Sequence, residues 1–153
     1  MDGTSAPHRS SLPRTIARVV LGLFLLVAGI GHLTFGREEF TAQVPDWLPV
    51  PDDLVVVGSG VVELALGASL IALPRHRVAV GWLSAAFFVA VFPGNIAQYV
   101  NQVDAFGLTS DGARAVRLVF QPLLVLWALW STGAWRDRGT SWRPRASSSN
   151  SRG

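Results

Sequence analysis

The sequence contains no cysteine and no lysine among its 153 residues. Without cysteine, the chain forms no disulfide, holds no iron–sulfur cluster through thiolates and carries out no thiol redox chemistry. Without lysine, all thirteen basic side chains are arginine. These arginines lie at the ends of apolar stretches and in the C-terminal tail, and they form no basic face interleaved with aromatics. A nucleic-acid partner is therefore not expected.

Charged residues of either sign are also scarce, at 15% of the chain, whereas hydrophobic residues make up 50%. A typical soluble domain has roughly 25% charged residues. A soluble chain of this length needs more polar surface, because small domains expose a large surface for their volume. The apolar excess favours a protein whose surface faces lipid rather than water.

Signatures of catalysis and metal binding are missing as well. The sequence has no GxSxG, P-loop or HExxH motif, and Ser59 lies four residues before Glu63 with no basic partner evident. His8, His32 and His76 are expected at different depths, so they cannot share one haem or metal ion. The sequence thus predicts no metal site and no intrinsic cofactor, and it leaves open whether the protein is an enzyme.

Four stretches are long and apolar enough to cross a membrane, whose hydrocarbon core of about 30 Å takes roughly 20 helical residues. They run over about residues 15–35, 54–73, 78–100 and 113–135. The connection between the second and third stretches is too short for anything but an antiparallel turn. We therefore expect an all-α fold, an integral membrane four-helix bundle over residues 14–135.

Charge placement predicts how this bundle is oriented. The two tails and the turn between the second and third stretches carry ten arginines: Arg9, Arg14, Arg18, Arg75, Arg77, Arg136, Arg138, Arg143, Arg145 and Arg152. The opposite side carries three arginines and seven acidic residues: Arg37, Arg114, Arg117, Glu38, Glu39, Asp46, Asp52, Asp53, Asp104 and Asp111. By the positive-inside rule, both termini are expected in the cytoplasm of a multi-pass plasma-membrane protein, with the lipid bilayer as its first partner.

The segments flanking the bundle have little to bury. Residues 1–13 and 136–153 are rich in Ser, Arg, Pro and Gly, and we expect both to be disordered. The basic C-terminal tail is expected near anionic lipid headgroups. Between the first two stretches, the prolines at 45, 49 and 51 predict an extended and fairly rigid loop around Trp47. Trp47 is either an anchor in the membrane interface or part of a lid over a site beneath it.

Each membrane stretch carries polar residues, which are costly in lipid and usually face a bundle interior or a cavity. They are His32, Glu63, Asn95 with Gln98, and Arg117 with Gln121. A rise of about 1.5 Å per residue places all of them in the outer half of the membrane. His32, Glu63, Asn95, Arg117 and Gln121 are therefore the candidate ligand-binding residues, or a purely structural network that joins the helices.

Helical spacing adds detail to this candidate site. Phe88, Phe92 and Tyr99 share a face with Asn95 and are expected to form the pocket wall. Pro93 and Pro122 each remove a backbone hydrogen bond and should kink their helices beside the polar residues. A carboxyl group in lipid needs a cation or a proton, so we expect Glu63 to pair with Arg117.

Five short motifs in order resemble the DoxX family of small four-helix bacterial membrane proteins. They are GIGHLTF, FTAQVPDWLPVP, SGVVELALG, VFPGN and RLVFQP, and the resemblance covers about residues 14–135. It implies a four-helix bundle whose polar site is made by His32, Glu63, Asn95, Arg117 and Gln121. It also implies an association with quinone-linked redox systems, with a bound quinone as the possible cofactor.

Three functions follow as hypotheses. The first is an accessory subunit of a quinone-linked redox system, at most a part of an oxidoreductase complex, that binds a lipophilic ligand in an outer-half polar pocket. The second is a structural or assembly protein without a ligand. The third is a small proton-coupled transporter using Glu63, which is disfavoured because the inner halves of the helices are apolar. Partners are expected to be a redox protein or further copies of the chain.

Overall fold

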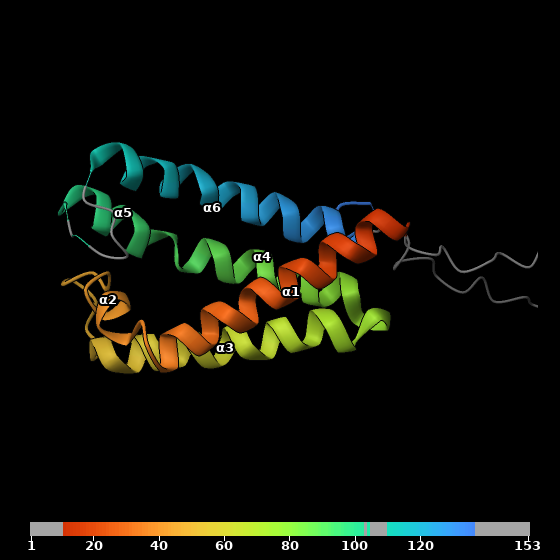
Figure 1. The fold of residues 1–153 in the computed structure, drawn as a ribbon, viewed down its shortest axis with the longest axis horizontal. Coiled ribbons are helices and arrows are strands. Elements are labelled where there is room, and N and C mark those ends of the chain that lie inside the picture. Colours follow the sequence, from red (N-terminus) through yellow and green to blue (C-terminus); the bar gives the residue numbers. More distant parts are fainter. Residues whose placement is uncertain (1–10, 103, 105–109, 137–153) are drawn as a thin grey trace, which may run out of the picture.

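The computed structural model describes residues 11–102, 104 and 110–136, and within these residues the fold is all-helical, with no strand. Four chain segments run the length of the molecule (Figure 1). The helices are α1 (Leu12–Leu33), α2 (Arg37–Thr41), α3 (Asp52–Ala72), α4 (Arg77–Ala90), α5 (Phe92–Val100) and α6 (Asp111–Thr132), with a 3-10 turn η1 (Pro74–His76). We call the end that carries α2 and α5 the α2 end, and the opposite one the η1 end.

Glycines bring α1 and α3 into close contact as an antiparallel pair. A Cβ atom added at Gly67 would lie 2.7 Å from the carbonyl oxygen of Gly22, and one added at Gly60 would lie 2.8 Å from Cβ of His32. Both distances are too short for real side chains, so each crossing point requires glycine. Small residues at helix crossings are typical of membrane bundles. The α1–α3 pair therefore rests on backbone contact rather than on interlocking large side chains.

The second pair consists of α6 and the segment formed by α4 and α5, and α1 joins the two pairs at the η1 end. There Trp127 Nε1 of α6 donates to the carbonyl oxygen of Ala17, 3.0 Å away. Arg18 donates to the carbonyl oxygen of Leu70, in the last turn of α3 where helical donors run out. Figure 1 shows α1 crossing obliquely, near α6 at the η1 end and beside α3 at the α2 end.

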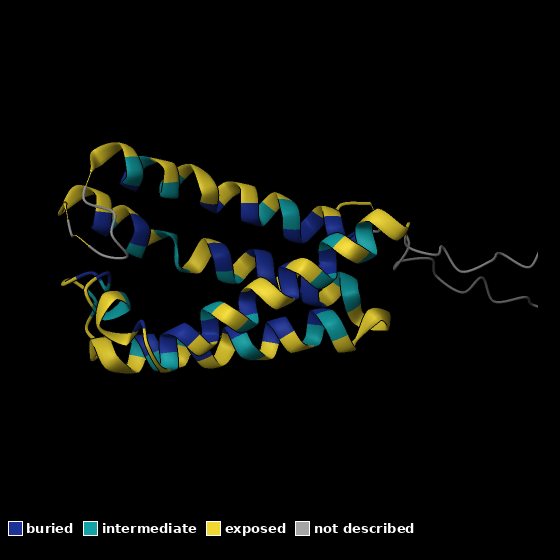
Figure 2. Ribbon diagram, in the orientation of Figure 1, coloured by how far each residue is buried: buried dark blue, intermediate teal, exposed yellow. Residues whose placement is uncertain are grey.

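The apolar core follows from this crossing. Its buried side chains lie toward the η1 end and in the middle of the bundle, where the pairs meet: Leu21, Leu25, Leu66, Leu70, Val80, Ala85, Phe88, Leu124, Ala128, Leu129 and Ala134. Large hydrophobic side chains such as Leu23, Val61 and Leu126 are exposed. Figure 2 shows exposed positions along the outer faces of the helices. Four helical segments are long and apolar enough to span a membrane, the third comprising η1, α4 and α5.

The expected helices agree with the structure to within three residues at most boundaries. The exception is the third, which is broken at Val91, two residues before Pro93, so the kink expected there is present as a break. Pro122 lies inside α6, which continues past it. The loop expected to be extended begins instead with the short helix α2. Of the tails expected to be disordered, Leu12 and Pro13 belong to α1, and residues 1–10 and 137–153 lie outside the described residues.

Candidate functional site

A cavity of about 630 Å³ opens at the α2 end, where the two helix pairs diverge. Cavities of roughly 300–1,000 Å³ are typical of small-molecule sites. Side chains from α1, α3, α5 and α6 line it, and the walls are mostly apolar. The structure brings all five predicted polar residues onto this one cavity: His32, Glu63, Asn95, Arg117 and Gln121.

His32 is held on the cavity wall by α3. Its Nδ1 atom lies 2.8 Å from Oγ of Ser59, and this hydroxyl also donates to the carbonyl oxygen of Val56 at 2.9 Å. A hydroxyl has one proton, and here the carbonyl receives it, so Oγ accepts a hydrogen bond from Nδ1–H. This fixes the tautomer of a neutral His32 ring with Nε2 unprotonated. The ring also packs edge-on against Phe40, with ring centroids 3.4 Å apart.

Glu63 lies one helical turn along α3 from Ser59, on the same face. Its Oε2 atom is 3.5 Å from Nδ1 of His32, an ion-pair distance rather than a hydrogen bond. Glu63 is only 8% exposed, and Oε2 has no hydrogen-bond partner among the described residues. Ser59 and Glu63 both face the same ring nitrogen, so they do not form a serine–histidine–acid relay, whose two partners occupy opposite nitrogens.

Asn95 and Gln121 form a second polar pair across the cavity. Nδ2 of Asn95 donates to Oε1 of Gln121 at 2.9 Å, and Nε2 of Gln121 donates to the carbonyl oxygen of Phe88 at 2.6 Å. Phe88 lies in the last turn of α4, where carbonyl groups lack helical donors. The side chain of Gln121 therefore caps the helix end that the break at Val91 creates. This pair has a structural role whether or not the cavity holds a ligand.

Arg117 lines the cavity one turn before Gln121 on α6, and it is partly buried. Oε2 of Glu63 lies close to His32 of α1, at the 3.5 Å given above. Pairing of Glu63 with Arg117 stays a prediction. Both residues nevertheless line the cavity, so a guanidinium group and a carboxyl group belong to the same site.

The segment after α2 covers the cavity as a roof, which we define as residues 43–48. Five of these residues line the cavity: Gln43, Val44, Pro45, Trp47 and Leu48. Trp47, the residue expected in a lid, is thus part of the roof, and it is largely exposed on its other side. The roof reaches across to the second helix pair, because a Cβ added at Gly94 of α5 would lie 3.3 Å from the carbonyl oxygen of Gln43.

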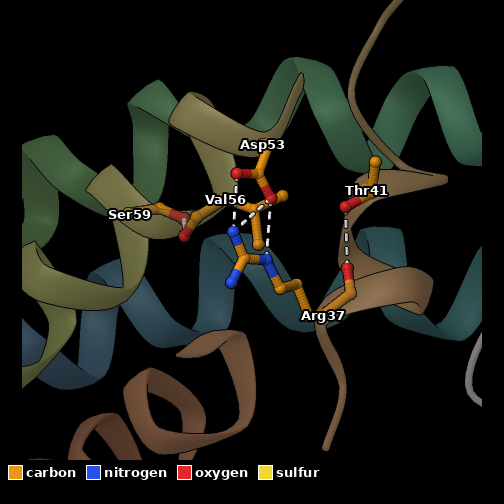
Figure 3. A network of polar contacts seen from close by, with 5 residues as sticks. All are labelled: Arg37, Thr41, Asp53, Val56 and Ser59. Atoms are coloured by element: carbon orange, nitrogen blue, oxygen red, sulfur yellow. Dashed lines mark hydrogen bonds and ion pairs between the residues drawn. The ribbon is translucent and has the colours of Figure 1, made fainter. Parts of the chain in front are cut away.

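One ion pair ties α2, the helix that precedes the roof, to α3 (Figure 3). Nε and Nη2 of Arg37 donate to the two carboxylate oxygens of Asp53, at 2.7 Å and 2.5 Å. Thr41 Oγ1 also donates to the carbonyl oxygen of Arg37 at 2.8 Å, within α2. The two-point contact between Arg37 and Asp53 joins the first residue of α2 to the first turn of α3.

Of the three side chains expected to form the pocket wall, Phe88 lines the cavity, and Phe92 and Tyr99 do not. Phe88 is buried and lines the cavity, whereas the other two do not line it, and Tyr99 is exposed. The prediction assumed one continuous helix, so that Phe88, Phe92 and Tyr99 would share a face. Because the helix is broken at Val91, residues of α5 do not continue the helical face of α4 on which Phe88 lies. The residues of α5 that line the cavity are Pro93, Gly94 and Asn95.

Several site residues were not foreseen from the sequence. Ser59 was noticed but given no basic partner, because nothing in the sequence places His32 opposite it on the neighbouring helix. Gln43 carries no local signal for being a buried part of the roof. Arg114 was expected on the outer side of the membrane; it does not line the cavity, and its buried side chain is bonded to Asp104 and Asp111, the latter at 2.8 Å. An acidic residue at i−3 is the one signal that was available for it.

The side chains around the cavity are suited to binding a small molecule. Within the part of the chain that the structure describes, no three His, Asp or Glu side chains gather closely enough to hold a metal ion. What the cavity offers is a histidine, a carboxyl group, a guanidinium and two amides on an apolar wall. Such a site can hold a molecule that is mostly apolar with one polar end.

Comparison with known families gives a match to a family described as "Domain of unknown function (DUF8561)" over residues 21–132. The match spans most of the chain, and the protein belongs to this family. The resemblance to the DoxX family is wrong, since no match to that family was found. Its motifs are short, and small residues, prolines and single polar residues recur in tightly packed membrane helices generally. No curated protein and no solved structure matches the chain.

Proposed function

We propose that this member of the family is a multi-pass membrane protein that binds a lipophilic ligand with a polar end in the cavity at the α2 end. One observation carries the proposal: polar side chains from four helices converge on a single cavity of about 630 Å³ whose remaining wall is apolar. Polar groups are costly in a membrane interior and are usually kept where they face one another or a bound molecule.

The distribution of charge supports a membrane location with both termini in the cytoplasm. Both ends of the described chain lie at the η1 end (Figure 1), together with Arg14, Arg75, Arg77 and Arg136. Seven acidic residues lie toward the α2 end: Glu38, Glu39, Asp46, Asp52, Asp53, Asp104 and Asp111. The positive-inside rule then orients the η1 end to the cytoplasm and opens the cavity toward the outer face of the plasma membrane.

The quinone-linked redox role rested on the DoxX resemblance and loses that support, as does the bacterial assignment. A quinone stays one candidate among lipophilic ligands with a polar end. A purely structural role accounts for Asn95 and Gln121. Asn95 donates a hydrogen bond to Gln121, and Gln121 donates one to the carbonyl oxygen of Phe88 at the end of α4. It does not account for Glu63, whose buried Oε2 has no hydrogen-bond partner among the described residues. The apolar core at the η1 end disfavours a transport path through the bundle.

Mass spectrometry of organic extracts tests the proposal. The full chain is purified in mild detergent beside Glu63→Ala and, as a control, Ser84→Ala, which removes a buried polar group away from the cavity. We expect a near-stoichiometric lipophilic molecule in the unmodified protein and in the control, and its loss from Glu63→Ala. An empty extract from folded, unmodified protein would favour the structural role and an unknown protein partner.

A further inference from the structure

Beyond the polar groups, apolar side chains of α1 and α6 line the cavity and also reach the outside of the bundle. The hydrogen bond between Trp127 and Ala17 sets the register of these antiparallel helices. Counting seven and eleven residues from this contact places Phe24 level with Phe120, and Ala28 level with Val116. These four residues line the cavity, yet Phe24, Phe120 and Val116 are also about half exposed on the outside of the bundle. A side chain that faces both the cavity and the surroundings marks the place where the two connect.

The opening is entirely apolar, and in a membrane it faces hydrocarbon. It also lies deeper in the bundle than the roof, because Phe24 precedes His32 by eight residues, roughly 12 Å along α1. A bound molecule can therefore place its polar end beside His32 and Glu63, and lead its apolar part past Phe24 and Phe120 into the lipid. This shape fits an amphiphile with a single chain, which enters from the membrane rather than from water.

The polar end must supply a hydrogen-bond donor. Oε2 of Glu63 is buried with no hydrogen-bond partner among the described residues, and Nδ1–H of His32 is given to Ser59. Nδ2 of Asn95 donates to Oε1 of Gln121, and Nε2 of Gln121 donates to the carbonyl oxygen of Phe88. Arg117, which carries a guanidinium group, lines the same cavity as Glu63. A buried carboxylate oxygen without a partner calls for a donor such as a hydroxyl group.

From these features we infer that the ligand is a single-chain amphiphile with a hydroxyl head, whose hydroxyl donates to Oε2 of Glu63 and whose chain leaves between α1 and α6. The inference rests on the proposed function, since it names the chemistry of the ligand in the same cavity. It adds two requirements that lipophilic binding alone does not make: a donor on the head and a free passage beside Val116.

Photolabelling of the detergent-purified full chain tests both requirements. The probe is a long-chain alcohol with a diazirine in mid-chain, and its comparator is the methyl ether of the same compound, which accepts but cannot donate. We expect the alcohol to label peptides that contain Phe24 and Phe120, and the ether to label them at least about tenfold less, as loss of a hydrogen bond to a charged group implies. Equal labelling by alcohol and ether would overturn the donor requirement.

A matched pair of variants tests the opening. Val116 lines the cavity and is 62% exposed, whereas Val119, one turn away on α6, is 63% exposed and does not line it. Val116→Trp should reduce labelling by the alcohol severalfold, and Val119→Trp should leave it unchanged. Equal labelling of both variants would overturn the lateral passage. If the unmodified protein yields no extracted ligand and takes up neither probe, the proposed function itself fails, which separates that outcome from failure of the hydroxyl or of the passage alone.

Discussion

At the scale of single residues, His32 has two neighbours that face the same ring nitrogen. Ser59 takes the hydrogen bond at 2.8 Å, and Glu63 remains at 3.5 Å. Ser59 thus orients the ring and leaves Oε2 of Glu63 without a hydrogen bond among the described residues. A buried carboxyl oxygen of this kind costs free energy unless a ligand satisfies it. The hydroxyl group of Ser59 therefore orients His32, while its own proton is donated to the carbonyl oxygen of Val56.

The contribution of Ser59 can be separated from that of buried hydroxyl groups in general. Ser59→Ala removes the acceptor of Nδ1–H, and we expect it to destabilise the protein by about 1 kcal/mol and to reduce ligand retention. Ser84 is fully buried, and its hydroxyl has no partner among the described residues. Ser84→Ala should leave stability unchanged or slightly raise it. Thermal unfolding in detergent measures both variants, and an equal loss in the two would contradict the role given to Ser59.

At the scale of elements, the contact between α1 and α3 decides where His32 stands. The two helices approach so closely that a Cβ at Gly60 would lie 2.8 Å from Cβ of His32 and 3.2 Å from the carbonyl oxygen of Gly29. The atoms in the way belong to the backbone or are attached to it, so they cannot swing aside. Helix packing and site geometry are therefore coupled at this crossing.

Gly60→Ala should push α1 away from α3 and move His32 off Ser59. Overpacking of this kind typically costs about 1–3 kcal/mol. Gly58 is the matched control on the same helix, because no atom of the described residues lies within 4 Å of a Cβ added there. Gly58→Ala should be neutral or slightly stabilising, by at most about 1 kcal/mol from helix propensity. Similar unfolding temperatures for the two variants would contradict the close contact.

The roof is the other element whose position matters, and Arg37 ties α2, the helix that precedes it, to α3 through Asp53. Both side chains are largely exposed, so Arg37→Gln should change stability by less than about 1 kcal/mol. Its effect should instead be on motion of the roof. We expect faster amide hydrogen exchange over residues 43–48, with Arg75→Gln, a surface arginine at the η1 end, as the control. Unchanged exchange in Arg37→Gln would show that the ion pair does not hold the roof.

At the scale of the whole molecule, hydrophobic runs and the cost of polar groups in lipid predicted four helices and one shared polar site. His32, Glu63, Asn95, Arg117 and Gln121 do line one cavity. The break at Val91 could not be predicted from the local sequence. Pro93 is compatible with either a kinked helix or an interrupted one, and tertiary contacts decide between them. Ser59 and Gln43 were missed for a similar reason, since their roles arise only when helices and the roof are assembled.

The orientation of the bundle is open to a clean test because the sequence has no cysteine. Single variants Asp46→Cys, at the α2 end, and Arg75→Cys, at the η1 end, therefore each carry one reactive thiol. In intact cells, a membrane-impermeant maleimide should label Asp46→Cys, and it should label Arg75→Cys only after lysis. The reverse pattern would place both termini outside, and the cavity would then open toward the cytoplasm.

The account depends most on the cavity being an occupied binding site, and a density map of the protein in lipid nanodiscs tests this most directly. We predict continuous density that begins beside Glu63 and His32 and leaves the bundle between Phe24 and Phe120. A cavity closed by inward movement of the roof and of Phe24 and Phe120, with no additional density, would contradict the claim and leave the polar residues as contacts between helices.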